Sequence, residues 1–342
     1  MKKFMALVMA GVTLLGVTGC GTQNGKDAND VSSASGISAE STDNSASNKS
    51  SDTTPSSDTS TTSDSSTESD TEEMSNSDIP FETATVSISE TAMDYLKFGT
   101  GDKTFVIIPG LSIHSVLGSA QAIANAYAAF TDEYTVYLFD RPKDIPEDCT
   151  IRDLADDTAA AMQSLSIEGA DVFGASMGGM TAQYIAIDHP ALVNKMVLGS
   201  TLARPNATSE NIMKEWISLA EAKDENALLA SFADNIYSEA TLEAYRDTII
   251  SSNEGISDEE YERFITLANA CLSFDCYDEL SSIKCPILVI GSKGDKVLTA
   301  EGSTEIADAL GCEIYLYDEN YGHGVYDEAP DYVQRCLDFF AE

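Results

Sequence analysis

One short stretch of this sequence has residue types and spacing suited to nucleophilic chemistry. It reads Gly174-Ala175-Ser176-Met177-Gly178, and it lies between an apolar run and a helix-like segment. Glycines on both sides of a serine permit a sharp strand-to-helix turn that exposes the hydroxyl. The dipole of the following helix favours the negative charge that develops during attack on a carbonyl. The stretch therefore predicts a nucleophile, although a five-residue pattern in a Ser- and Gly-containing chain also fits an ordinary loop.

The elements that must position this serine indicate one large domain from about residue 81 to residue 342. Apolar runs alternate with helix-like runs, which is typical of βαβ units and a mainly parallel sheet. We expect the first strand to lie at an edge, because its residues alternate between apolar and polar. The expected strands cover residues 83–89, 93–98, 104–108, 134–139, 171–173, 195–198, 286–290 and 313–317, and the expected helices cover 120–130, 151–165, 177–187, 300–309 and 330–340.

The alternation stops after Leu202 and resumes at about Ser282. This stretch contains several helical segments and no convincing strand. Its length is too great for a plain connection between consecutive strands. We therefore predict an inserted helical cap over about 203–282, placed at the C-terminal edge of the sheet, where open α/β sheets bind ligands.

Three segments together make the chain similar to the α/β-hydrolase superfamily. They are the turn at Ser176, the run 287–297 that leads from an apolar strand into a loop with Asp295, and the loop 322–324 with His323 before a terminal helix. The order of serine, acid and histidine is that of this fold. The resemblance covers the domain from residue 81 onward, and it implies an α/β-hydrolase fold and a serine hydrolase activity.

The resemblance assigns a role to each of the three side chains. His323 would take the proton of Ser176 during attack and later protonate the leaving group. Asp295 would fix the tautomer of the imidazole and stabilise its protonated form. Asp278 and Asp318 remain alternatives for the acid, since both lie in the C-terminal third of the chain.

The resemblance also implies two main-chain donors for the oxyanion formed in acyl transfer. These are the N–H groups of Met177, after the nucleophile, and of Leu111, in the loop after an early strand. That loop reads Pro109-Gly110 where the family commonly has His-Gly, so the identity of its donor stays open. His114 is expected to be a loop residue, with a place in the pocket as the alternative. His189, which precedes a proline at a helix end, is expected to be structural.

The first twenty residues predict export and lipid attachment. Two lysines precede an uncharged apolar run over 4–17, which is short for a membrane span. The residues Val17-Thr18-Gly19-Cys20 resemble the lipobox of bacterial lipoproteins, which implies a lipid on Cys20. We expect a domain anchored to the extracytoplasmic face of a cell membrane, as on a Gram-positive bacterium, with an ordinary cleaved signal peptide as the alternative.

Residues 21–80 consist mostly of Ser, Thr, Asp, Asn, Gly, Ala and Glu. Such a composition cannot bury enough apolar surface to fold, so this segment is predicted to be a disordered linker. The following domain has 45 acidic and 15 basic residues, and the whole chain has a net charge of −38. This charge argues against partners such as nucleic acid or anionic lipid head groups.

Neither a metal nor a cofactor is expected, because zinc-type cysteine spacing, a dinucleotide fingerprint and a phosphate-binding loop are all missing from the sequence. Export would permit disulfides, but buried free thiols fit the apolar surroundings of several cysteines equally well. Cys271 and Cys276 are the first pair to test for a bridge. The cysteines of the domain are Cys149, Cys271, Cys276, Cys285, Cys312 and Cys336.

These features predict an extracytoplasmic enzyme that cleaves a small ester, thioester or amide through an acyl-enzyme on Ser176, with carboxylesterase as the leading expectation. Proline-iminopeptidase-like activity and hydrolysis of a carbon–carbon bond are alternatives, because the same fold supports them. A ligand-binding or sensing module on the same fold is a further alternative from another class.

Overall fold

The computed structural model describes residues 78–89 and 91–342. The predicted leader, with the predicted lipidation site Cys20, and the predicted linker up to residue 77 lie outside the described residues. Within the described part of the chain, every helix is too short or too polar to cross a bilayer.

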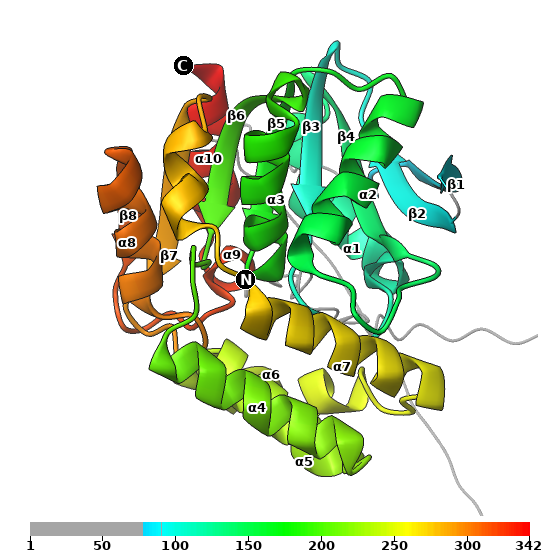
Figure 1. Ribbon diagram of the computed structural model, residues 1–342, viewed down its shortest axis with the longest axis vertical. Helices are drawn as coiled ribbons and strands as arrows, with labels where there is room; N and C mark the ends of the chain where they lie inside the picture. The colour runs from blue at the N-terminus through cyan, green and yellow to red at the C-terminus, as the bar shows by residue number, and fades with distance from the viewer. Residues whose placement is uncertain (1–77, 90) are drawn as a thin grey trace, which may run out of the picture. The chain divides into compact units, whose positions relative to one another are not determined.

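In the described residues eight strands form one sheet in the order β1-β2-β4-β3-β5-β6-β7-β8 (Figure 1). β1 pairs with β2 and β2 with β4 in antiparallel fashion, and all later pairs are parallel. The prediction of a mainly parallel sheet with the first strand at its edge is therefore confirmed. The strands are β1 (Phe81–Ile88), β2 (Thr91–Phe98), β3 (Lys103–Ile108), β4 (Tyr134–Pro142), β5 (Ala170–Ala175), β6 (Val193–Gly199), β7 (Ile287–Ser292) and β8 (Glu313–Tyr317).

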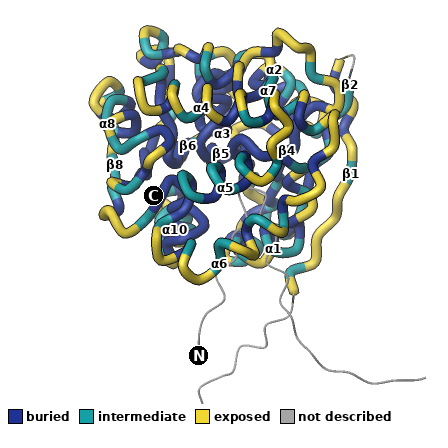
Figure 2. The backbone as a smooth tube through the Cα atoms, turned by 90° about the horizontal axis from the view of Figure 1, so that it is seen from below, coloured by how far each residue is buried: buried dark blue, intermediate teal, exposed yellow. Residues whose placement is uncertain are grey.

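The burial of each strand follows its place in the sheet. All residues of β5 and β7 are buried, because parallel strands in the middle of such a sheet have both faces covered. β1 instead alternates between exposed and buried residues toward its end, and Figure 2 shows it as an exposed segment at the rim of the molecule.

Helices cover both faces of the sheet and create two apolar cores. One face carries α2 (Ile151–Ser164), α3 (Met177–Asp188) and α8 (Thr299–Leu310), and the other carries α1 (Ala120–Ala126) and α10 (Tyr332–Ala341) (Figure 1). A single-turn helix α9 (Val325–Glu328) precedes α10, and 3-10 turns η1 (Val116–Ser119), η2 (Ala128–Phe130), η3 (Pro190–Leu192) and η4 (Tyr277–Ser282) complete the connections.

The expected continuous helix over 120–130 is wrong, because the α-helix ends at Ala126 and a 3-10 turn follows. Tyr127 leaves the helical region with φ −99° and ψ 21°. This break lets the rings of Tyr127 and Phe130 both pack against Phe105 of β3, with centroids 5.9 and 4.3 Å away. Packing of large aromatic side chains thus overrides the helix preference of the alanines around them.

The segment predicted as a cap contains four α-helices between β6 and β7, beside the C-terminal ends of the strands (Figure 1). Each begins at a residue whose side chain accepts a hydrogen bond from the first helical turn, namely Asn206, Asp224, Ser238 and Ser257. Such caps satisfy N–H groups that a helix leaves unpaired. The cap helices are α4 (Ala207–Glu221), α5 (Glu225–Ile236), α6 (Glu239–Ser251) and α7 (Asp258–Ser273).

Candidate active site

Ser176 lies at the turn between β5 and α3, in a backbone conformation that side chains rarely adopt. Its φ is 54° and its ψ is −119°. The flanking glycines are required for close approach of the backbone. A Cβ on Gly174 would lie 2.4 Å from the Gly178 carbonyl oxygen, and one on Gly178 would lie 1.9 Å from the Ile108 carbonyl oxygen. The Gly-x-Ser-x-Gly pattern therefore encodes the strained turn that presents the serine.

Two contacts with β6 and the loop after it hold this turn in place. The Ser176 N–H donates to the carbonyl oxygen of Gly199 at 2.8 Å, and the Thr201 hydroxyl donates to the carbonyl oxygen of Ser176 at 2.8 Å. The Ser176 side chain makes no capping bond to α3. Its hydroxyl is thus left for a side chain beyond the turn.

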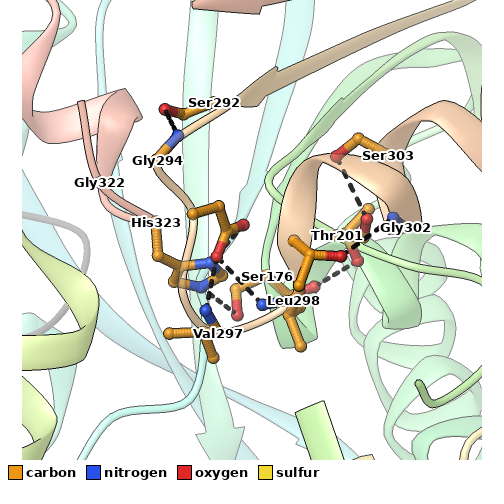
Figure 3. Close-up of polar contacts among 12 residues, drawn as sticks. Ser176, Thr201, Ser292, Gly294, Val297, Leu298, Gly302, Ser303, Gly322 and His323 are labelled. Carbon is orange, nitrogen blue, oxygen red and sulfur yellow. Dashed lines mark hydrogen bonds and ion pairs between the residues drawn. The ribbon is translucent and has the colours of Figure 1, made fainter. Parts of the chain in front are cut away.

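His323 connects Ser176 with Asp295. Its Nε2 lies 2.9 Å from the Ser176 Oγ (Figure 3). Its Nδ1 lies 2.9 Å from one carboxylate oxygen of Asp295. The other carboxylate oxygen accepts N–H bonds from Val297 at 2.8 Å and Leu298 at 3.0 Å. Serine, histidine and aspartate are all buried. The three side chains that the sequence analysis grouped are therefore together in space.

The alternative acids have other neighbours. The Asp318 side chain accepts a hydrogen bond from the Asn320 N–H at 3.0 Å, and Asp278 lies in the short turn η4. The main chain at Asp318 instead supports the loop of Asp295, because the Ser292 hydroxyl donates to the Asp318 carbonyl oxygen at 3.1 Å. The structure thus favours Asp295 as the partner of the histidine.

A buried carboxylate that the sequence analysis missed fixes the histidine loop to the cap. One Glu328 oxygen accepts from the Gly322 N–H at 2.7 Å, next to His323. The other accepts from the N–H of Ser238, the first residue before α6, at 2.8 Å. Glu328 is 3% exposed. The sequence offers no clear signal for this role, because the cap residue is 90 positions away.

The predicted oxyanion loop runs directly over the nucleophile. A Cβ on Gly110 would lie 3.2 Å from the Ser176 Cβ, so this position needs a small residue. Leu111 and Met177 are both buried. Within residues 78–89 and 91–342, neither the Leu111 N–H nor the Met177 N–H has a hydrogen-bond acceptor. Two main-chain donors therefore stand unused in the neighbourhood of the serine.

His114, further along the same loop, contacts the cap rather than the nucleophile. Its Nδ1 lies 2.7 Å from a Glu260 oxygen on α7, and its Nε2 lies 3.0 Å from the Asn253 carbonyl oxygen. Burial raises the pKa of Glu260, but hydrogen bonds with His114 and Ser257 outweigh it and lower the pKa to about 2. The expectation of a loop residue holds for His114, and its role is to tie this loop to the cap.

His189 and the cysteines have structural surroundings. The His189 Nε2 lies 2.7 Å from an Asp156 oxygen near the surface, in line with the expectation for this histidine. All six cysteines of the described chain are free thiols, so the possible bridge between Cys271 and Cys276 does not form. Burial raises the pKa of both thiols to about 12. A protonated, enclosed thiol is a poor nucleophile.

The serine is enclosed, being 7% exposed. A separate groove is lined by other residues and does not include Ser176. The groove has a volume of about 1310 Å³ and runs between α7 and residues 143–147, with Ser115, Glu260 and Arg263 at the side of the oxyanion loop. Among the described residues, no group of three or more His, Cys, Asp and Glu side chains could hold a metal ion. The arrangement at Ser176 is suited to proton transfer and nucleophilic attack in a site shielded from water.

Comparison with known proteins relates this geometry to a family. A family model described as alpha/beta hydrolase fold matches residues 103–330. Two curated relatives are the "Putative carbamate hydrolase RutD" of Pseudomonas savastanoi, 26% identical over 64% of this chain and 88% of that protein, and the 3-oxoadipate enol-lactonase 2 of Acinetobacter baylyi, 24% identical over 63% of this chain and 80% of that protein.

Among solved structures, the α/β-hydrolase enzyme MGS-M2 from a Medee basin deep-sea metagenome library has a TM-score of 0.68. It is 20% identical, and the match covers 76% of this chain and 98% of that one. This likeness supports the same fold.

Proposed function

Because this chain belongs to the α/β-hydrolase fold family, we propose that it is a serine hydrolase that cleaves a small ester, thioester or amide through an acyl-enzyme on Ser176. The observation that carries this proposal is the continuous chain of short contacts from the Ser176 Oγ through His323 to Asp295, at 2.9 Å each. The strained turn places this hydroxyl at the start of α3. A nucleophile, a base and a group that orients the base are the parts that acyl transfer needs.

In the first half-reaction, the Ser176 Oγ bonds to the substrate carbonyl carbon while His323 Nε2 takes the hydroxyl proton. The carbonyl electron pair moves onto oxygen, and the resulting oxyanion accepts hydrogen bonds from the N–H groups of Met177 and Leu111. When the carbonyl re-forms, the bond to the leaving group breaks. The proton on Nε2 passes to the leaving oxygen, sulfur or nitrogen.

In the second half-reaction, His323 takes a proton from water, and the hydroxyl attacks the acyl carbon on Ser176. Collapse of this second tetrahedral intermediate returns the proton to the serine and releases the acid. Asp295 accepts the Nδ1–H bond throughout and balances the positive charge on the imidazole. The N–H bonds from Val297 and Leu298 keep its carboxylate in place.

The substrate class rests on the kinds of bond that this machinery can break and on the relatives. One relative carries a name for carbamate hydrolysis and the other a name for enol-lactone hydrolysis. Both names refer to hydrolysis of a bond between a carbonyl carbon and oxygen or nitrogen. These names support a small carbonyl substrate, and carboxylesterase activity is the leading proposal.

We further propose that the enzyme works on the extracytoplasmic face of a membrane, held by a lipid on Cys20. The support is the sequence of residues 1–20, in which two lysines, an apolar run and Val17-Thr18-Gly19-Cys20 follow one another. Replacing Cys20 by alanine should move the protein from the membrane fraction to the medium. An unchanged membrane fraction for this variant would refute the anchor.

The test of the enzymatic proposal compares wild type with Ser176→Ala. Wild type should turn over p-nitrophenyl acetate repeatedly and take one label from a fluorophosphonate probe, whereas Ser176→Ala should do neither. A matched control is Ser200→Ala, which changes a buried serine in the neighbouring loop. Release of one acyl equivalent without further turnover would favour the sensing module instead, and cleavage of proline p-nitroanilide alone would favour the iminopeptidase-like alternative.

A further inference from the structure

The mechanism leaves one buried cation without a role, and this cation contacts the oxyanion loop. Arg141 lies near the end of β4 and is 8% exposed. Its Nη2 donates to the carbonyl oxygen of Pro109 at 2.9 Å and also to that of Gly110. Both carbonyls belong to the loop that passes over Ser176. A guanidinium held on two successive carbonyls restricts this loop more than one neutral hydrogen bond would.

The carboxylate next to Arg141 in the chain does not pair with its guanidinium. Asp140 accepts a bond from the Arg141 main-chain N–H at 2.8 Å, and the Ser115 hydroxyl donates to its other oxygen. Within the described residues, the Nε of Arg141 is buried and has no partner. Burial lowers the pKa of Arg141 to about 10, so the side chain stays protonated at neutral pH. Burying a cation is costly for stability unless hydrogen bonds replace its lost hydration, and here the Pro109 and Gly110 carbonyls accept those bonds.

The direction of the carbonyls determines the direction of the N–H groups. In a trans peptide the C=O and the following N–H point in opposite directions. Because Arg141 holds the Gly110 carbonyl, the Leu111 N–H of the same peptide is turned away from the guanidinium. This N–H is buried and has no acceptor in the described part of the chain. Glycine by itself would let this peptide rotate through many conformations.

We propose that Arg141 is the positioning residue of the oxyanion hole: it fixes the Gly110–Leu111 peptide so that the Leu111 N–H donates to the oxyanion formed at Ser176. This inference rests on the proposed function and deepens it. The role of Arg141 also explains why Pro109-Gly110 can stand where the family commonly has His-Gly. Arg141 orients the loop through hydrogen bonds to main-chain carbonyls, and these need no histidine side chain. Arg141 itself does not touch the reacting atoms.

The test replaces Arg141 with methionine, which has a similar length and no donor, and with lysine, which keeps the charge but not the planar guanidinium whose Nη2 donates to both carbonyls. Loss of one oxyanion donor lowers kcat by about 10²–10³. We expect kcat on p-nitrophenyl acetate to fall about 100-fold in Arg141→Met and about 10-fold in Arg141→Lys, with KM within about threefold of wild type. Arg246→Lys is the matched control, because Arg246 pairs with Asp234 on the cap.

A second readout separates positioning from general support of the fold. In protein labelled with ¹⁵N-leucine, the Leu111 amide proton should move downfield when a phosphonate forms a tetrahedral adduct on Ser176. This change in chemical shift should be smaller in both Arg141 variants than in wild type. If Arg141→Met does not fold, the chemical shift measured in Arg141→Lys tests the positioning role. Partial recovery of kcat in Arg141→Met with added guanidinium ion would further support the role.

Two results would overturn the inference while leaving the proposed function intact. One is a kcat of Arg141→Met within threefold of wild type. The other is a reduced kcat with the Leu111 shift of wild-type size. A wild-type protein that neither labels nor turns over would instead refute the proposed function, and the role of Arg141 with it.

Discussion

Replacement of Asp295 by asparagine tests the proposed mechanism most sharply, because the structure determines how the new side chain must face. One Asp295 oxygen accepts N–H bonds from both Val297 and Leu298, and the other faces His323 Nδ1. An asparagine keeps its carbonyl oxygen on the two main-chain donors, since the opposite orientation would place its NH₂ against them. The NH₂ group therefore faces Nδ1 and donates to it.

This orientation inverts the tautomer of His323. An Nδ1 that accepts a hydrogen bond carries no proton, so the proton of the neutral ring lies on Nε2, which then cannot accept the proton of Ser176. The same substitution in a Ser-His-Asp enzyme of another fold lowers kcat about 10⁴-fold. A factor of this size corresponds to about 5 kcal/mol of transition-state stabilisation. We expect Asp295→Asn to lose kcat by about this factor while its thermal unfolding temperature changes little.

The assay is the steady-state kcat on p-nitrophenyl acetate, with circular dichroism and thermal unfolding to show that the variant is folded. Asp318→Asn is the matched control, because Asp318 is the rival acid and contacts Asn320 instead of the histidine. Its kcat should stay within about twofold of wild type. A kcat of Asp295→Asn that is a tenth of the wild-type value, or a loss in Asp318→Asn as large as that in Asp295→Asn, would refute the proposed role of Asp295.

Two further predictions concern stability. Gly178→Ala should lower the free energy of unfolding by about 3 kcal/mol or more in urea titrations and abolish activity, because its Cβ would lie 1.9 Å from a main-chain oxygen. Gly118→Ala is the control, because nothing lies within 4 Å of its Cβ. It should leave the free energy of unfolding and the activity unchanged. The pKa of Glu260, about 2, lies below its ordinary value of 4.5, so its contacts stabilise the fold above pH 4.5 and that stability is lost as the pH falls toward 2. Glu260→Gln should therefore have a lower Tm than wild type at pH 7, and the difference should narrow between pH 4.5 and 2; a difference that does not vary with pH would contradict this reasoning.

The sequence was sufficient for the architecture because the relevant signals are local. Continuous apolar runs such as 287–290 predict buried parallel strands, and polar residues ahead of helical segments fix where helices begin. The break at Tyr127 was not predicted, because the packing of its ring against Phe105 outweighs the helix preference of nearby alanines. Packing of a large side chain in a densely packed core can thus outweigh the helix propensity of the surrounding residues.

The sequence by itself determined the turn at Ser176, because the glycines around it are needed for backbone contacts that any such turn makes. It also indicated His323 and Asp295 through their order along the chain. Only the tertiary structure placed Asp295 against His323, and only it revealed that Glu328 contacts the histidine loop and Arg141 the loop at Pro109-Gly110. The contacts of Asp295 with His323, of Arg141 with Gly110 and of Glu328 with Ser238 join residues 28, 31 and 90 positions apart in sequence. The burial and the partner of a charged residue are therefore defined only once the chain has folded.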